Sequence, residues 1–187
     1  DTGANALVRS STNSNTLYAS TYQRRRNACC MNGGGPGSGV WKSVDGGDNW
    51  SRVTGGGFPD GPLGRIEVDV YGRDDQVVYA LVEGPRVGGN GPGGRDQSED
   101  GEVENLTGLY RSQDGGATWT LMSNTNPRPM YFSQVRVDPV DPDRVYMGGV
   151  GLHLTVDGGE TFATDAARLT HDDVHAIWIN PENPDHV

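Results

Sequence analysis

The sequence predicts an all-β protein built from repeated four-stranded antiparallel units, and three observations support this prediction. Glycine and proline account for 29 and 11 of the 187 residues, which is too many turn-forming residues for long helices. Apolar and polar residues alternate along short segments, a period of two that is typical of strands. A motif centred on Asp-Gly-Gly occurs three times, and such internal repeats indicate a repeated structural unit.

The repeated motif predicts a β-hairpin at residues 39–50, 108–119 and 151–162. In each copy a strand precedes Asp-Gly-Gly, whose glycines supply the positive φ of a tight turn, and an aromatic residue opens the second strand. We expect structural roles for the aspartates and aromatic residues, because a catalytic group is needed once whereas a turn and its packing are needed in every repeat. These residues are Asp45, Trp50, Asp114, Trp119, Asp157 and Phe162.

A pair of alternating strands precedes each hairpin. The pairs are 6–8 with 16–19, 66–70 with 77–82, and 135–139 with 144–147. A further first strand is expected at 176–180. Each repeat thus holds four antiparallel strands, which is the composition of a β-propeller blade.

The expected architecture over residues 1–187 is a partial β-propeller of about three blades plus one strand. The blades are expected at approximately 4–57, 62–123 and 131–164, and the start of a further blade at 173–187. Because propellers close with about 4 to 8 blades, we expect the rest of the propeller or another chain to complete the structure. Uncovered terminal blades predict that the segment alone associates with other copies.

Composition excludes several classes of partner. Lysine and arginine number 15 against 25 acidic residues, a net charge of −10, which argues against nucleic acid and anionic membranes. No apolar run approaches the roughly 20 residues of a membrane span. We therefore expect no nucleic-acid partner, no membrane span and no cofactor.

Two adjacent cysteines, Cys29 and Cys30, are the only ones in the chain. Two cysteines cannot provide a disulfide framework or a complete zinc site. A bridge between neighbours requires a strained eight-membered ring, so two ordinary thiols in a loop are favoured, with a vicinal disulfide or a redox role as the alternatives.

The repeated Ser/Thr-x-Asp-Gly-Gly-x-Thr/Asn-Trp/Phe resembles the Asp box of BNR-type β-propellers, which include sialidases, xyloglucanases and the luminal domain of sortilin. The segments 22–26, 33–39, 61–66 and 175–181 are similar to large exported bacterial proteins described as sortilin-like or glycosyl-hydrolase-like. The resemblance implies a secreted, periplasmic or cell-surface location and a larger full-length protein. The three repeated boxes are a strong indication of the fold and a weak indication of activity.

The candidate ligand-binding residues lie in the long connections, which blade topology places on the face opposite the Asp-Gly-Gly turns. Variable loops on a rigid scaffold commonly carry function. Arginine suits carboxylates and bidentate sugar contacts, and tyrosine suits ring stacking. The candidates are Arg24, Arg25, Arg26, Arg128, Tyr131, His171, Asp173 and His175, with Arg86 and Arg95 on the same face. The alternative is that these arginines pair with carboxylates such as Asp60 and Asp173.

Neither a metal site nor a catalytic centre is predicted. His171 and His175 would be about 13 Å apart in an extended strand, too far to chelate one ion. The acidic stretch at 96–104 offers carboxylates for glycoside hydrolysis, but a solvated loop is favoured.

The favoured function is a non-catalytic propeller that binds an extracellular peptide or polysaccharide. The alternatives are a glycoside hydrolase resembling the xyloglucanases, with its two acids on separate blades, and an assembly subunit completed by another chain. The Arg-Ile-Pro signature of sialidases is absent, the nearest match being residues 64–66.

Overall fold

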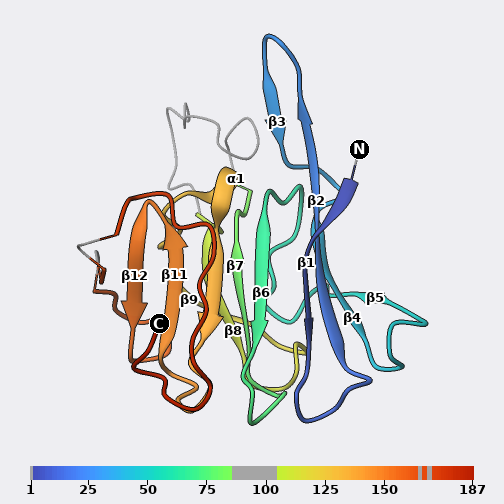
Figure 1. The fold of residues 1–187 in the computed structure, drawn as a ribbon. Coiled ribbons are helices and arrows are strands. Elements are labelled where there is room, and N and C mark those ends of the chain that lie inside the picture. Colours follow the sequence, from blue (N-terminus) through green and yellow to red (C-terminus); the bar gives the residue numbers. More distant parts are fainter. Residues whose placement is uncertain (1, 86–104, 164–165, 168–169) are drawn as a thin grey trace.

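The computed structural model describes residues 2–85, 105–163, 166–167 and 170–187. In these ranges the chain forms three antiparallel sheets in sequence order and one short helix (Figure 1). The predicted all-β class is confirmed.

The first sheet has the strand order β1-β2-β4-β5. Its strands are β1 (Thr2–Arg9), β2 (Leu17–Arg26), β4 (Gly39–Ser43) and β5 (Ser51–Arg52). A short strand, β3 (Met31–Gly33), pairs with the end of β2, and the resulting hairpin projects beyond the sheet (Figure 1).

The second sheet has the order β6-β7-β8-β9 and the third the order β10-β11-β12. The second contains β6 (Ile66–Val70), β7 (Val78–Val82), β8 (Gly108–Ser112) and β9 (Thr120–Ser123). The third contains β10 (Gln134–Val137), β11 (Val145–Gly149) and β12 (Gly151–Thr155). The helix α1 (Pro129–Phe132) lies in the connection between these two sheets.

The third sheet departs from the expected four strands. Its fourth position is an isolated bridge between Leu154 and Ala163, with reciprocal backbone hydrogen bonds of 3.0 and 2.8 Å. Ala166 N–H adds a bond of 2.7 Å to the carbonyl of Leu152. The chain therefore pairs at this edge without forming a regular strand.

The strand expected at 176–180 is also not formed, although the turn that should follow it is. Asn180 N–H donates to the carbonyl of His186 at 3.0 Å. The same bond across six residues closes the first turn of each sheet, from Ser10 to Thr16, Tyr71 to Val77 and Asp138 to Arg144. No strand pairs with residues 176–180 in the described structure, so the fourth unit is represented by its turn.

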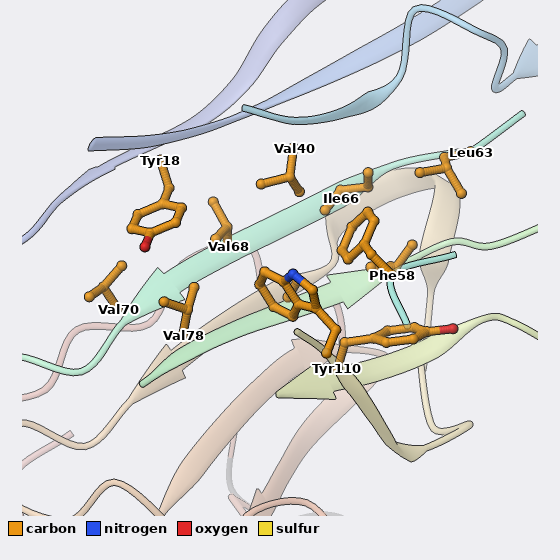
Figure 2. Close-up of a cluster of buried hydrophobic side chains, with 12 residues drawn as sticks. Tyr18, Val40, Phe58, Leu63, Ile66, Val68, Val70, Val78 and Tyr110 are labelled. Atoms are coloured by element: carbon orange, nitrogen blue, oxygen red, sulfur yellow. The ribbon is translucent and has the colours of Figure 1, made fainter. Parts of the chain in front are cut away.

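Adjacent sheets pack face to face through two apolar clusters. Figure 2 shows the cluster between the first and second sheets, where Tyr18 and Val40 meet Ile66, Val68 and Val78. The cluster between the second and third sheets is formed by Tyr71, Tyr79, Leu81, Leu109, Val135, Val137, Val145 and Met147. Alternate residues of β7 enter different clusters, which explains why this strand is apolar throughout.

The Asp-Gly-Gly turns lie at the same end of the sheets as the first turns. The N–H groups of Gly46, Gly115 and Gly158 donate to the carbonyls of Asn15, Gln76 and Asp143, each at 2.9 Å. The β2–β3 hairpin and α1 lie at the opposite end (Figure 1). For these described connections, the predicted separation from the Asp-Gly-Gly turns is confirmed.

A shared hydrogen-bond network explains the repeated aspartates. Asp114 Oδ1 accepts bonds from Ser112 Oγ and Thr118 N–H, both at 2.8 Å, and Oδ2 accepts from Thr118 Oγ1 at 2.6 Å. These donors lower the pKa of Asp114 to about 2. Equivalent donors from Asn49 and Ser43 lower the pKa of Asp45 to about 2, and those around Asp157 lower its pKa as well.

The three aromatic residues after these turns pack differently. Trp119 is 5% exposed in the cluster between the first two sheets, and Phe162 packs against the next cluster. Trp50 is 36% exposed. Each buried aromatic residue covers the sheet before its own, and no sheet precedes the first in the described structure, so Trp50 packs on its own turn through a 2.9 Å bond to the carbonyl of Gly47.

Candidate ligand-binding face

The arginine run, which was expected in a long connection, forms the end of β2. Arg24, Arg25 and Arg26 pair with Gly33, Asn32 and Met31 of β3. Successive side chains of a strand point to opposite faces, so Arg24 and Arg26 share a face and Arg25 lies on the other. The three predicted arginines therefore do not point to one common surface: Arg24 and Arg26 face one side of the hairpin and Arg25 the other.

Tyr131 of α1 is the centre of the arrangement, and its side chain is 38% exposed. The guanidinium carbons of Arg24 and Arg128 lie 5.7 and 5.5 Å from its ring centroid, within cation–π range. Arg26 Nη1 donates to the Tyr131 hydroxyl at 3.3 Å. We call Arg24, Arg26, Arg128 and Tyr131 the Arg–Tyr cluster.

The Arg–Tyr cluster is held by bonds from three parts of the chain. Arg65, at the start of the second sheet, donates from Nη1 to the backbone carbonyl of Tyr131. The Tyr22 hydroxyl of β2 donates to the carbonyl of Met130 at 3.4 Å. Ser133 Oγ donates to the carbonyl of Pro129 at 3.0 Å. The helix that carries Tyr131 is thus tied to both of the first two sheets.

The carboxylate pairing considered for the arginines is not what the structure shows. Within the described ranges, no carboxylate lies at ion-pair distance from Arg24, Arg26 or Arg128. Asp60 and Asp173 form no ion pair with them. Three exposed guanidinium groups, none with a carboxylate partner among the described residues, therefore gather on the surface of a chain with a net charge of −10.

Of the remaining candidates, one lies beside the Arg–Tyr cluster and two do not. His175 reaches the cluster through Phe132, whose ring centroid lies 4.4 Å from that of His175 and 5.8 Å from the guanidinium of Arg128. His171 lines a separate hollow of about 600 Å³ against the third sheet, together with Tyr146 and Trp178. Asp173 is exposed and has a positive φ of 75°.

The tip of the β2–β3 hairpin forms a hollow of about 330 Å³ beside the cluster. It is lined by Arg26, Asn27, Ala28, Cys29, Cys30, Met31, Met130 and Tyr131. Its walls are therefore largely sulfur-containing and aromatic, with one guanidinium.

The structure joins Cys29 and Cys30 in a disulfide, so the favoured expectation of two thiols is corrected. The hairpin tip explains the proximity. Asn27 N–H bonds to the carbonyl of Cys30 at 3.0 Å, and Asn27 Oδ1 accepts the N–H groups of Cys29 and Cys30 at 3.2 and 2.9 Å. These bonds hold both cysteines in one tight turn.

Glu83, a buried carboxyl directly after β7, was not predicted as a site residue from the sequence. It is 4% exposed, its Oε2 accepts Arg65 N–H at 3.1 Å, and burial raises its pKa. No cation pairs with it among the described residues. The sequence signal for this residue is a glutamate that directly follows the apolar run at 77–82.

Two further acids of β6 face the third sheet, Glu67 buried and Asp69 half-buried. Glu67 pairs with Arg136 at 3.2 Å, and burial raises its pKa. Asp69 accepts Val137 N–H at 2.9 Å, and burial raises its pKa to about 6. Because Ile66, Val68 and Val70 face the first sheet, strand alternation could have placed both acids on the opposite side.

In the part of the chain that the structure describes, no group of three or more His, Cys, Asp or Glu residues could hold a metal ion. No helix described there is long and apolar enough to cross a membrane. Arg86, Arg95 and the acidic stretch 96–104 lie outside the described residues.

Comparison with known proteins supports the fold. No protein-family model matches the chain. A xyloglucanase from Paenibacillus sp. is 35% identical over 87 residues, which cover 46% of this chain and 8% of the relative. A GH74 enzyme from Niastella koreensis aligns with a TM-score of 0.54 at 20% identity, over 87% of this chain and 22% of its own. The GH74 xyloglucanase from Xanthomonas campestris aligns with a TM-score of 0.54 at 16% identity, over 88% of this chain and 24% of its own.

Together, the repeated sheets and the structural likeness are consistent with part of a β-propeller like those of the GH74 enzymes. The chain spans less than a quarter of the length of each of these relatives.

Proposed function

We propose that the chain is the ligand-binding segment of a β-propeller that recognises an extracellular polysaccharide through the Arg–Tyr cluster. The observation that carries the proposal is the group of three guanidiniums, without carboxylate partners in the described ranges, around one partly exposed tyrosine ring. An aromatic ring can stack on the apolar face of a sugar, and guanidinium donors match its oxygens.

The similarity to a xyloglucanase over 46% of the chain supports a carbohydrate rather than a peptide. The extracellular setting is part of the proposal, and so is the relation of the repeated turns to the Asp box. The extracellular setting and the Asp-box relation both rest on the resemblance of the repeated motifs to BNR-type propellers.

A non-catalytic role is favoured because glycoside hydrolysis requires two carboxyl groups about 5 to 9.5 Å apart. Two buried glutamates lie near this end of the sheets in the described residues, and Glu67 is ion-paired with Arg136 at 3.2 Å, which leaves Glu83 as the one without a cation partner.

A second candidate function is a segment of a glycoside hydrolase. Glu83 favours it, because a buried carboxyl with a raised pKa is the form that a general acid requires. The second carboxyl would come from another part of a longer protein.

Binding to a panel of soluble polysaccharides tests the proposal, by affinity electrophoresis followed by calorimetry. Tyr131→Ala should weaken binding about tenfold, because it removes the ring. Asp48→Ala, at the Asp-Gly-Gly end, is the matched control and should bind normally. Retained binding in Tyr131→Ala, or loss only in Asp48→Ala, would contradict the proposed face. Release of reducing ends that Glu83→Gln abolishes would favour the hydrolase.

A further inference from the structure

The hollow at the hairpin tip has the size and walls of a site for one small ring. Its volume of about 330 Å³ lies at the lower end of ligand sites, which span about 300 to 1,000 Å³. The Cys29–Cys30 disulfide, Met31 and Met130 provide polarizable sulfur, and Tyr131 provides a flat ring. These surfaces suit the apolar face of a sugar ring.

The charge beside the hollow selects among sugars. Arg26 lines it directly and donates to the Tyr131 hydroxyl at 3.3 Å. Arg24 and Arg128 lie within 5.7 Å of the same ring centroid. Three like charges around one ring repel one another, and an anion placed among them removes that repulsion. The rest of the acidic chain would repel such an anion, so attraction is confined to this spot.

We propose that the hollow binds a sugar unit bearing a carboxylate, that is, a uronic acid of an acidic polysaccharide. This rests on the proposed function and names its ligand class. The sugar ring lies against Tyr131 and the disulfide, and the carboxylate accepts hydrogen bonds from the guanidinium of Arg26, with Arg24 and Arg128 adding charge. Guanidinium and carboxylate match in geometry, which a neutral hydroxymethyl group does not reproduce.

The site is preorganised by bonds that do not involve the ligand. Asn27 holds the disulfide turn through both cysteine N–H groups. Tyr22 and Arg65 hold the backbone of α1 through the carbonyls of Met130 and Tyr131. Walls fixed before binding reduce the entropy lost on association.

Two polymers that differ only in the group at C6, a carboxylate or a primary alcohol, test the inference on the whole chain. Polygalacturonate is compared by calorimetry with the same polymer after reduction of its carboxyls to primary alcohols. We expect polygalacturonate to bind about tenfold more tightly or better, with an affinity that falls as salt rises. Arg26→Gln and Arg128→Gln should each weaken binding of polygalacturonate more than binding of the reduced polymer, and so remove most of that preference. Arg73→Gln, exposed at the opposite end, is the matched control.

Each other outcome has a distinct meaning. Equal binding of both polymers would overturn the carboxylate assignment while the polysaccharide proposal stands. Binding of neither, nor of any other polysaccharide in the panel, would overturn the proposed function itself. Equally tight binding of dextran sulfate would show a response to charge alone and overturn the uronic-acid assignment. A preference that survives both arginine variants but disappears in Arg73→Gln would overturn the site.

Discussion

The hydroxyl of Tyr18, in the first sheet, donates a hydrogen bond of 2.8 Å to the backbone carbonyl of Gly115 in the Asp-Gly-Gly turn of the second. Tyr79, at the equivalent place in the second sheet, donates to the carbonyl of Pro142 in the third at 2.9 Å. Lys42 Nζ also bonds to the Gly115 carbonyl, at 2.7 Å. The turn ends of the second and third sheets therefore accept hydrogen bonds from side chains of the preceding sheet.

Removing either tyrosine hydroxyl should destabilise the packing of sheets. Tyr79→Phe and Tyr18→Phe should each lower the free energy of unfolding by about 1 kcal/mol, the net value of a hydrogen bond. The Tyr79 change should cost more, because the Gly115 carbonyl keeps Lys42 whereas that of Pro142 has no other donor among the described residues. Urea unfolding measures both, with Tyr131→Phe as a control that removes a long, exposed bond to Arg26 and should change stability less. Equal stability of all three variants and the parent chain would contradict the role of these bonds.

Asp114 should maintain the turn and not bind the ligand. Asp114→Ala removes the acceptor of three hydrogen bonds, so we expect a lower unfolding temperature with unchanged polysaccharide affinity. Asp48→Ala serves as the control, since Asp48 accepts no bond in the neighbouring turn. An unchanged unfolding temperature combined with lost binding would show a ligand role.

Acid should destabilise the chain below about pH 4. The pKa values of Asp45 and Asp114 are about 2 in the folded protein, against about 3.9 in an unfolded chain. The unfolded state binds protons first, so the stability contributed by these groups is complete above about pH 4 and is lost as the pH falls toward 2. Urea midpoints measured through this range should show the loss, and Asp114→Asn should reduce its steepness. A midpoint that is constant from pH 4 to 2 would contradict the lowered values.

Asp69 should have the opposite effect at higher pH. Burial raises its folded pKa to about 6, so between about pH 4 and 6 the folded state binds the proton more tightly than the unfolded state. Stability should therefore decline as the pH rises through this window. Asp69→Asn should flatten the decline, whereas Asp60→Asn, at an exposed position, should leave it intact. If stability declines as steeply in Asp69→Asn as in the parent chain, another group causes the decline and the prediction for Asp69 is contradicted.

The cysteine pair should be oxidised. Without reductant, iodoacetamide should add nothing to the intact chain, and after treatment with a dithiol it should add two carbamidomethyl groups, as judged by mass spectrometry. Alkylation at Cys29 and Cys30 before reduction would show free thiols instead.

Local chemistry in the sequence was sufficient for the repeated elements. The strand pairs around residues 66–82 and 135–147 follow from alternation, and the hairpins follow from Asp-Gly-Gly, because a tight turn depends on the φ angles of its own glycines. Blade topology also placed two of the long connections, the β2–β3 hairpin and the segment with α1, opposite these turns. The turn between Asn180 and His186 forms even where the flanking strands do not, which shows how local its causes are.

The tertiary structure decided which of the candidate residues meet. Arg24, Arg128 and Tyr131 come together because the β2–β3 hairpin and α1 reach the same end of adjacent sheets, whereas His171 lies against a separate hollow. Strand pairing with β3 separated Arg25 from its neighbours, and burial at the end of β7 set the environment of Glu83. Turns and alternation arise within a few residues of the chain, whereas contacts between residues about 100 positions apart depend on how whole sheets pack.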